Sequence, residues 1–152
     1  MKVFLDTNVF AEYIFERNQF KSVQRIFQAI ENKEIEAITS SASIYTLTYL
    51  SEQMLNRKGI HQPELTEQVR KIILSILQLV HIGNMEQSDM ISGVNNTSFS
   101  DIEDCFQYQC ALKNHCSYLI SINIKDFPNA STSIEAITPV VFVEKITPSL
   151  LQ

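Results

Sequence analysis

Short apolar runs alternate along this chain with longer segments in which apolar residues recur every three or four positions. The first run is apolar at consecutive positions, which predicts a buried strand over residues 2–5. The segment 20–31 places apolar residues from Val23 to Ile30 on one helical face, which predicts an amphipathic helix. The same criteria predict further strands at 34–39, 79–82, 118–121 and 134–137, and further helices at 8–15, 41–54, 63–77, 85–94, 101–113 and 139–145.

Strands that alternate with helices predict the fold class. The expected architecture is α/β, with three layers in which helices cover both faces of a short central parallel sheet. A length of 152 residues fits one domain over residues 1–152. Ligands of such sheets bind at the carboxyl ends of the strands, so polar residues directly after strands are the first candidates for chemistry.

Acidic residues gather at the positions that this architecture brings together. Asp6 comes directly after the first strand, Asp101 and Asp104 open a later helix, and Asn123 and Asp126 follow the fourth strand. Carboxylates that converge repel one another, and a divalent cation is the usual way to hold them at neutral pH. Oxygen ligands suit Mg²⁺ or Mn²⁺ rather than zinc. The inferred chemistry is phosphodiester hydrolysis by a water molecule that the metal activates.

Each acidic residue also has a purely structural interpretation. Asp6 could cap the helix that begins near Asn8. Asp101 and Asp104 could stabilise the start of their helix through its dipole. In a regular helix Glu103 points away from the face of Asp104, so it is predicted to lie on the surface.

Composition restricts the class of ligand. Seventeen acidic residues against twelve Lys and Arg give a net charge of -5 and a pI near 5.1. This balance argues against a protein that holds nucleic acid by bulk electrostatics, although a metal site or a local basic patch can still attract phosphate. Arg17, Lys21 and Lys125 are candidates to flank an RNA path, and each also fits a solvated surface.

The lack of a recognisable targeting signal and the number of cysteines predict a cytoplasmic protein. The apolar stretches are far shorter than the roughly 20 residues that a membrane-spanning helix needs. Asp6 interrupts the N-terminal run before a signal-peptide apolar region forms, so the mature chain is expected to begin at Met1 and to stay in the cytoplasm. Cys105, Cys110 and Cys116 are expected to be reduced core residues rather than zinc ligands.

Three segments carry the acidic residues in a specific order: VFLDTNVF at 3–10, DIEDCFQYQCAL at 101–112 and YLISINIKDF at 118–127. Together they resemble the PIN domain family, and within it the VapC-like toxin ribonucleases. Asp6 matches the family's first catalytic aspartate and Asp104 its central one. The resemblance implies a single PIN-like domain with Mg²⁺-dependent endoribonuclease activity on RNA, usually a homodimer and often encoded beside a small antitoxin protein.

Metal and catalytic roles follow from this resemblance together with the positions of the acids. Asp6 and Asp104 are expected to be the principal ligands of Mg²⁺ or Mn²⁺. Asp101 and Asp126 are expected to bind the metal directly or through water. Asn123 is expected to be a neutral ligand or to orient the attacking water, and Asp126 and Asn123 are counted with Asp6 and Asp104 as catalytic.

Two residues are predicted to support the site, and two positions differ from the pattern of the family. Asn8 and Ser121 are expected to hold a carboxylate in place by hydrogen bonds. The family normally carries a glutamate in the helix after the second strand. This chain has Thr46 near that position, and Glu52 lies too far downstream to take the role. Many members have an aspartate where this chain has Asn123, and each missing carboxylate should weaken metal binding.

Two other readings compete with an active nuclease. A catalytically degenerate PIN domain would bind RNA or a protein through the apolar faces of the early helices without cutting. A receiver domain also places acids at strand ends, but it needs a phosphoacceptor aspartate after a central strand and a late lysine, and no convincing pair occurs. If the chain is a toxin, the resemblance implies an antitoxin that covers the carboxylates, and residues 10–27 offer it an apolar groove.

Overall fold

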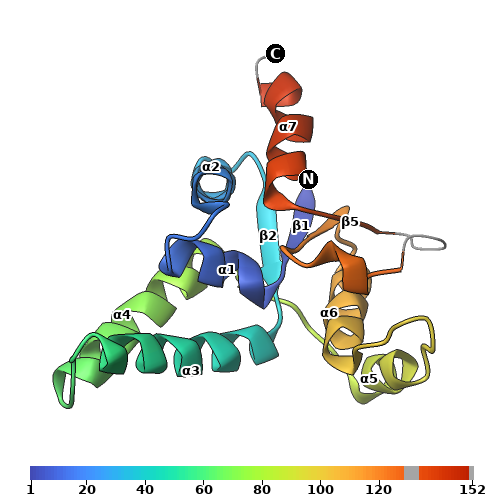
Figure 1. Ribbon diagram of the computed structural model, residues 1–152. Coiled ribbons are helices and arrows are strands. Elements are labelled where there is room, and N and C mark those ends of the chain that lie inside the picture. Colours follow the sequence, from blue (N-terminus) through green and yellow to red (C-terminus); the bar gives the residue numbers. More distant parts are fainter. Residues whose placement is uncertain (129–133, 151–152) are drawn as a thin grey trace.

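Strand β1 (Lys2–Leu5) lies at the centre of a five-stranded parallel sheet with the order β3-β2-β1-β4-β5 (Figure 1). The computed structural model describes residues 1–128 and 134–150. The remaining strands are β2 (Glu36–Thr39), β3 (His81–Ile82), β4 (Tyr118–Ile120) and β5 (Glu135–Ile137). Every neighbouring pair is parallel, so the predicted parallel sheet is confirmed.

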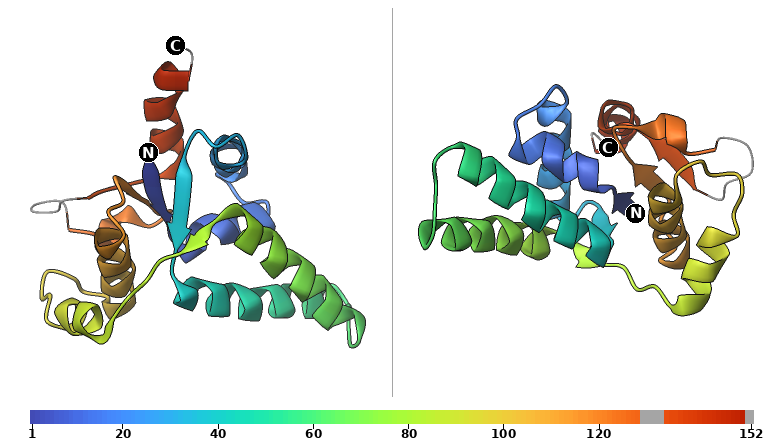
Figure 2. Two further views of the ribbon diagram at one scale, coloured as in Figure 1. Left: turned by 180° about the vertical axis from the view of Figure 1, so that it is seen from behind. Right: turned by 60° about the horizontal axis from the view of Figure 1, so that its bottom comes forward.

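Helices connect the strands and cover the sheet. They are α1 (Thr7–Ile14), α2 (Phe20–Glu31), α3 (Ser41–Arg57), α4 (Glu64–Leu79), α5 (Gln87–Val94), α6 (Ile102–Lys113) and α7 (Pro139–Leu150), with a 3-10 turn, η1 (Ile124–Asp126), after β4. Figure 1 shows α1 and α2 on one side of β1 and β2, and α6 on the other. The two views of Figure 2 show α3 and α4 side by side as a helical hairpin.

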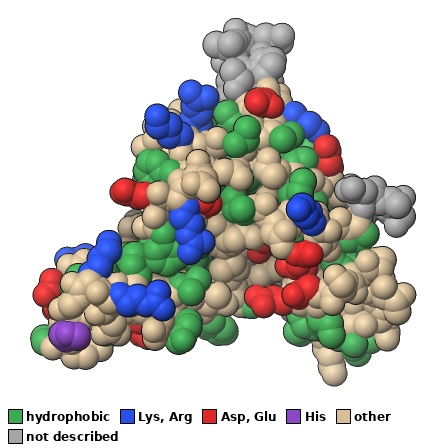
Figure 3. All heavy atoms as spheres, viewed as in Figure 1, with side chains coloured by type: hydrophobic (Ala, Val, Ile, Leu, Met, Phe, Trp, Pro, Cys, Tyr) green, Lys and Arg blue, Asp and Glu red, His purple; other side chains and the backbone are tan. Residues whose placement is uncertain are grey.

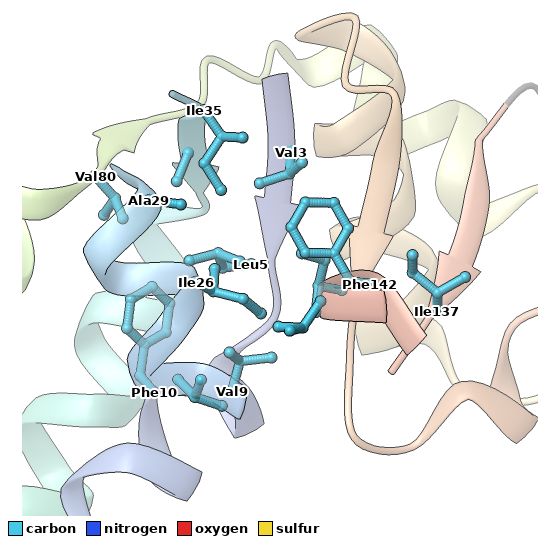
Figure 4. Close-up of a cluster of buried hydrophobic side chains, with 14 of the residues drawn as sticks. Val3, Leu5, Val9, Phe10, Ile26, Ala29, Ile35, Val80, Ile137 and Phe142 are labelled. Carbon is cyan, nitrogen blue, oxygen red and sulfur yellow. The ribbon is translucent and has the colours of Figure 1, made fainter. Parts of the chain in front are cut away.

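The central strand divides the core between the two sides. Successive side chains of a strand point to opposite faces. Val3 and Leu5 accordingly pack with Phe142 of α7 and Ile26 of α2 (Figure 4), whereas Phe4 packs with residues of α6 on the other face. The three-layer α/β/α arrangement predicted from the sequence is thereby confirmed.

Polar residues at strand ends start the helices that surround the site. Asp6 is the N-cap of α1, Ser40 is the N-cap of α3, and Asp101 is the N-cap of α6. Each of these side chains accepts a hydrogen bond from a backbone N–H of the first turn, which satisfies a donor that the helix leaves unpaired. The N-termini of α1 and α3 therefore lie at the carboxyl edge of the sheet.

Several element boundaries differ from the prediction. Strand β2 begins at residue 36 rather than 34, and α3 continues to Arg57 rather than ending at residue 54. Helix α7 reaches Leu150 rather than residue 145. The apolar pattern marks the face of a helix that packs on the core, and it does not fix the residue at which the helix ends.

The cysteines are buried, as predicted. Cys105, Cys110 and Cys116 are free thiols with at most 5% of their surface exposed. Burial raises the pKa of Cys110 to about 11 and that of Cys116 to about 12, so both stay protonated and pack as small apolar groups. Among the described residues, no helix combines the length and the apolar character required to cross a bilayer.

Truncation of Phe142 should strongly destabilise the protein. Its ring is fully buried in the cluster around β1 and lies edge-on to Tyr118, with ring centroids 5.7 Å apart. Phe142→Ala is expected to lower the free energy of unfolding by about 3–5 kcal/mol, measured by urea denaturation. Val141→Ala, on the same helix at a position 38% exposed, is the control and should cost much less. Equal losses in the two variants would contradict the placement of α7.

Candidate functional site

Asp6 lies at the carboxyl end of β1 with only 5% of its surface exposed. Its Oδ1 accepts a hydrogen bond of 2.7 Å from the Thr7 backbone N–H. Its Oδ2 accepts hydrogen bonds from Asn8 Nδ2 at 2.9 Å and from Ser121 Oγ at 2.7 Å. Burial raises the pKa of Asp6, although the hydrogen bonds from Ser121 and Thr7 partly oppose this effect.

Asn8 and Ser121 tie two neighbouring strand ends together. The side chain of Asn8 accepts a hydrogen bond of 2.9 Å from the Ile122 backbone N–H through Oδ1, and its Nδ2 also lies 3.1 Å from Ser121 Oγ. The backbone N–H of Asn123 donates to Ser121 Oγ at 3.2 Å. The carboxylate of Asp6 is thus held by one polar network that spans the ends of β1 and β4.

Asp104 lies in the first turn of α6, among other acidic side chains. Desolvation, followed by the negative charges of Asp6, Asp101, Asp126 and Glu103, raises its pKa to about 6. The carboxylates that sequence analysis selected therefore act on one another electrostatically. In Figure 3, acidic side chains gather where α1, α3 and α6 meet, with basic side chains set around them.

The acidic cleft is a polar hollow of about 260 Å³ between α1, α3 and α6. Its lining residues are Asp6, Thr7, Asn8, Ala11, Arg17, Leu50, Glu103, Asp104 and Gln107. Glu103 is exposed, as predicted, but it is not turned away from the site, because it belongs to the same lining as Asp104. Arg17 lies in the lining, whereas Lys21 and Lys125 do not.

Asp101 and Asp126 lie outside that lining. Asp101 is exposed, and its Oδ1 caps α6 by accepting hydrogen bonds from the backbone N–H groups of Glu103 at 2.7 Å and Asp104 at 3.3 Å. The side chain of Asp126 accepts a hydrogen bond from Asn123 Nδ2. The structure therefore brings Asp6 and Asp104 together in the cleft and leaves Asp101 and Asp126 engaged at its margin.

Sequence analysis did not identify Ser43 and Gln107. Both are at least 98% buried, and Gln107 Nε2 donates a hydrogen bond of 3.2 Å to Ser43 Oγ, which also accepts one of 2.8 Å from Thr7 Oγ1. These bonds join α1, α3 and α6 around the cleft. A glutamine among the apolar positions of an otherwise buried helical face, next to Cys105 and Tyr108, is the signal that could have drawn attention to it.

The donor set fits a hydrated magnesium ion better than a fully protein-bound metal. Among the described residues, no three His, Cys, Asp or Glu side chains lie close enough to share one ion. No ion pair within the described parts of the chain neutralises Asp6 or Asp104. Two uncompensated carboxylates in a small polar cleft suit Mg²⁺, which binds through one or two carboxylates and keeps several waters.

Comparison with known proteins agrees with the fold. Residues 2–125 match a family model described as PIN domain. The chain belongs to the PIN domain family. Ribonuclease VapC1 from Aquifex aeolicus (strain VF5) is 32% identical over 147 residues, which cover 95% of this chain and 94% of that protein.

Solved structures share the PIN domain fold at low sequence identity. The structure of VapBC2 from Rickettsia felis bound to a DNA fragment from its promoter aligns with a TM-score of 0.64 and 14% identity, over 91% of this chain and 98% of that one. The structure of VapBC-1 from nontypeable Haemophilus influenzae aligns with a TM-score of 0.64 and 18% identity, over 92% of this chain and 99% of that one.

Removal of the Asp104 charge should stabilise the metal-free PIN domain at neutral pH. Its carboxyl has a pKa of about 6 in the folded chain against an ordinary 3.8, so the native state binds more protons than the unfolded state between these values. Stability is therefore lost as the pH rises through this window. The melting temperature of Asp104→Asn in chelator should exceed that of the wild type at pH 7, and the difference should shrink toward pH 4. A difference that is independent of pH would contradict this account.

Proposed function

We propose that this PIN domain is a ribonuclease that cleaves RNA phosphodiester bonds with Mg²⁺ or Mn²⁺, and that it is the cytoplasmic toxin of a toxin–antitoxin pair. The observation that carries the proposal is the pairing of Asp6 and Asp104 in one cleft at the carboxyl edge of the sheet. The 32% identity to a protein named Ribonuclease VapC1, over nearly the whole chain, supports the same activity.

The residues of the cleft would have different roles in hydrolysis. A bound divalent cation would lower the pKa of its water and stabilise the charge that develops on the scissile phosphate. Asp6 and Asp104 would hold that cation, with Asn8 and Ser121 fixing the orientation of Asp6 through their hydrogen bonds. Arg17, in the lining of the same cleft, is positioned to contact a phosphate of the RNA.

Residues at the margin would act through water. Asp101 and Asp126 lie close enough to raise the pKa of Asp104 but do not line the cleft, so we assign them to water molecules on the metal rather than to the metal itself. Asn123, hydrogen bonded to Asp126, would hold one of those carboxylates or orient the attacking water.

A catalytically degenerate domain is the alternative, and one position favours it. The resemblance to the family implies a glutamate near Thr46. Thr46 is three residues after Ser43 and four before Leu50, so by helical spacing it shares their face of α3, which is turned to the cleft. A glutamate at this position would have added a third carboxylate to the cleft, whereas threonine adds no charge. Such a domain would bind RNA or a partner protein without cutting it.

Substitution of either principal carboxylate should abolish cleavage. Asp6→Asn and Asp104→Asn each remove one of the two charges that would hold the cation, and each should lower the Mg²⁺-dependent rate on single-stranded RNA by at least about 100-fold. Glu52→Gln is the control, because Glu52 is exposed on α3 and does not line the cleft. Wild-type protein that binds RNA without cutting it at any Mg²⁺ or Mn²⁺ concentration would favour the degenerate alternative.

An apolar groove provides a docking surface for the proposed antitoxin. It has a volume of about 900 Å³ and runs between α1, α2 and α4, with Tyr13, Phe27 and Ile72 in its lining. The aromatic rings pack closely, with 4.9 Å between the centroids of Tyr13 and Phe27. An amphipathic helix or extended segment with large apolar side chains fits such a groove. Residues 10–27 form one wall, as expected, and α4 supplies a wall that was not predicted.

A bulky residue in the groove should weaken the complex with the antitoxin. Ser75 is exposed on α4 and lines the groove, so Ser75→Trp would occupy it without removing a core side chain. We expect the dissociation constant for the antitoxin encoded beside this chain, measured by titration calorimetry, to rise at least about 10-fold. Lys71→Trp, on the same helix outside the groove, is the matched control. Unchanged affinity of Ser75→Trp would place the antitoxin elsewhere.

We further propose that two copies of this PIN domain associate. Supporting this, exposed apolar side chains gather on α5 and at the start of α6, where Met90, Ile91, Val94 and Ile102 are each 45–58% exposed. Apolar surface of this kind is typical of an interface between subunits.

A further inference from the structure

Gln107 contributes the buried polar group that the proposed mechanism leaves without a role. It is only 2% exposed, in the middle of α6, and belongs to the lining of the acidic cleft. Its Nε2 donates to Ser43 Oγ at 3.2 Å. Its Oε1 is buried and has no hydrogen-bond donor within the described residues. Buried carbonyl oxygens in folded proteins are nearly always paired, so an unpaired one on a residue that lines a cleft indicates a missing donor.

The hydroxyl that receives this amide N–H is itself held by two other side chains. Ser43 Oγ, which receives the amide N–H, itself accepts a hydrogen bond of 2.8 Å from Thr7 Oγ1 and lies 3.0 Å from Ser40 Oγ. Thr7 follows Asp6 directly, so the network that orients Gln107 begins beside the buried carboxylate. One N–H of the amide is donated to Ser43 Oγ, and the amide oxygen has no donor within the described residues.

The chemistry of the cleft specifies what this oxygen can bind. Asp6, Asp104 and Glu103 line the same space and all present acceptor oxygens at neutral pH. A phosphate group would bring further acceptors and cannot satisfy Gln107. A divalent cation with bound water satisfies both needs, because the cation neutralises the carboxylates and its polarised waters donate hydrogen bonds.

We infer that Gln107 is a positioning residue of the cation site, and that its Oε1 accepts a hydrogen bond from a water molecule on the divalent cation held by Asp6 and Asp104. The inference rests on the proposed metal-dependent function. It assigns to this chain a neutral oxygen beside α3, the helix whose Thr46 supplies no carboxylate to the site.

Titration of the full chain with Mn²⁺ tests this assignment without relying on activity. Gln107→Met keeps the length of the side chain but removes its acceptor, and it should weaken Mn²⁺ binding about 10-fold by calorimetry. Gln107→Glu keeps an acceptor at the same place and should bind Mn²⁺ at least as tightly as the wild type. Gln109→Met is the control, because Gln109 lies beside Gly93 of α5, and it should leave binding unchanged.

The outcomes separate this inference from the proposed function. If the wild type binds Mn²⁺, Asp104→Asn does not, and Gln107→Met binds as the wild type does, then the role of Gln107 is overturned while the metal site stands. If Gln107→Glu weakens binding as much as Gln107→Met, the amide acts as a donor and the inference is also overturned. Folded wild-type protein without saturable Mn²⁺ binding would overturn both. Melting temperatures of all variants exclude loss of folding, and Gln107→Glu decides the matter if Gln107→Met does not fold.

Discussion

The carboxylate of Asp6 is buried at the end of the central strand, and the geometry of the whole site depends on how its charge is accommodated there. Burial raises its pKa, and hydrogen bonds from Thr7, Asn8 and Ser121 oppose that effect. These partners come from the start of α1 and from the end of β4, so the cost of burying one charge ties two neighbouring strand ends together. The same bonds hold the carboxylate in one orientation before any ligand arrives.

Stability alone does not explain why negative charges crowd around Asp104. Asp104 is placed among Asp6, Asp101, Asp126 and Glu103, which raise its pKa by repulsion. A fold selected only for stability would avoid such a cluster, whereas a binding site for a cation benefits from it because the ion relieves the repulsion. The oxygen of Gln107, which has no donor among the described residues, points to the same kind of ligand.

Helix α1 connects the two functional surfaces that we propose. Asp6 and Thr7, at and beside its N-cap, together with Ala11, line the acidic cleft, whereas Phe10 and Tyr13 line the apolar groove. The two surfaces therefore share one short helix as a wall. A protein that docks in the groove would therefore contact the helix whose N-cap is the buried carboxylate.

Sequence alone determined the order of the elements and the residues that start the site. Consecutive apolar residues in β1 and helical periodicity in α2 predict the parallel α/β fold, because burial on both faces of a strand and on one face of a helix leaves different periods in the sequence. Asp6 is marked by its position directly after β1, because ligands of parallel sheets bind at the carboxyl ends of the strands. Helices α3 and α7 run further than predicted, because an apolar pattern marks the packed face of a helix and does not fix its last residue.

Only the tertiary structure decided which acids share the cleft. The sequence left open whether Asp101 and Asp126 bind a metal directly, and in the structure one caps a helix and the other is bonded to Asn123, while Glu103 lines the cleft. The bond between Gln107 and Ser43 joins residues 64 positions apart. No local pattern records such a contact, because it depends on how α3 and α6 pack around the sheet rather than on the period of either helix.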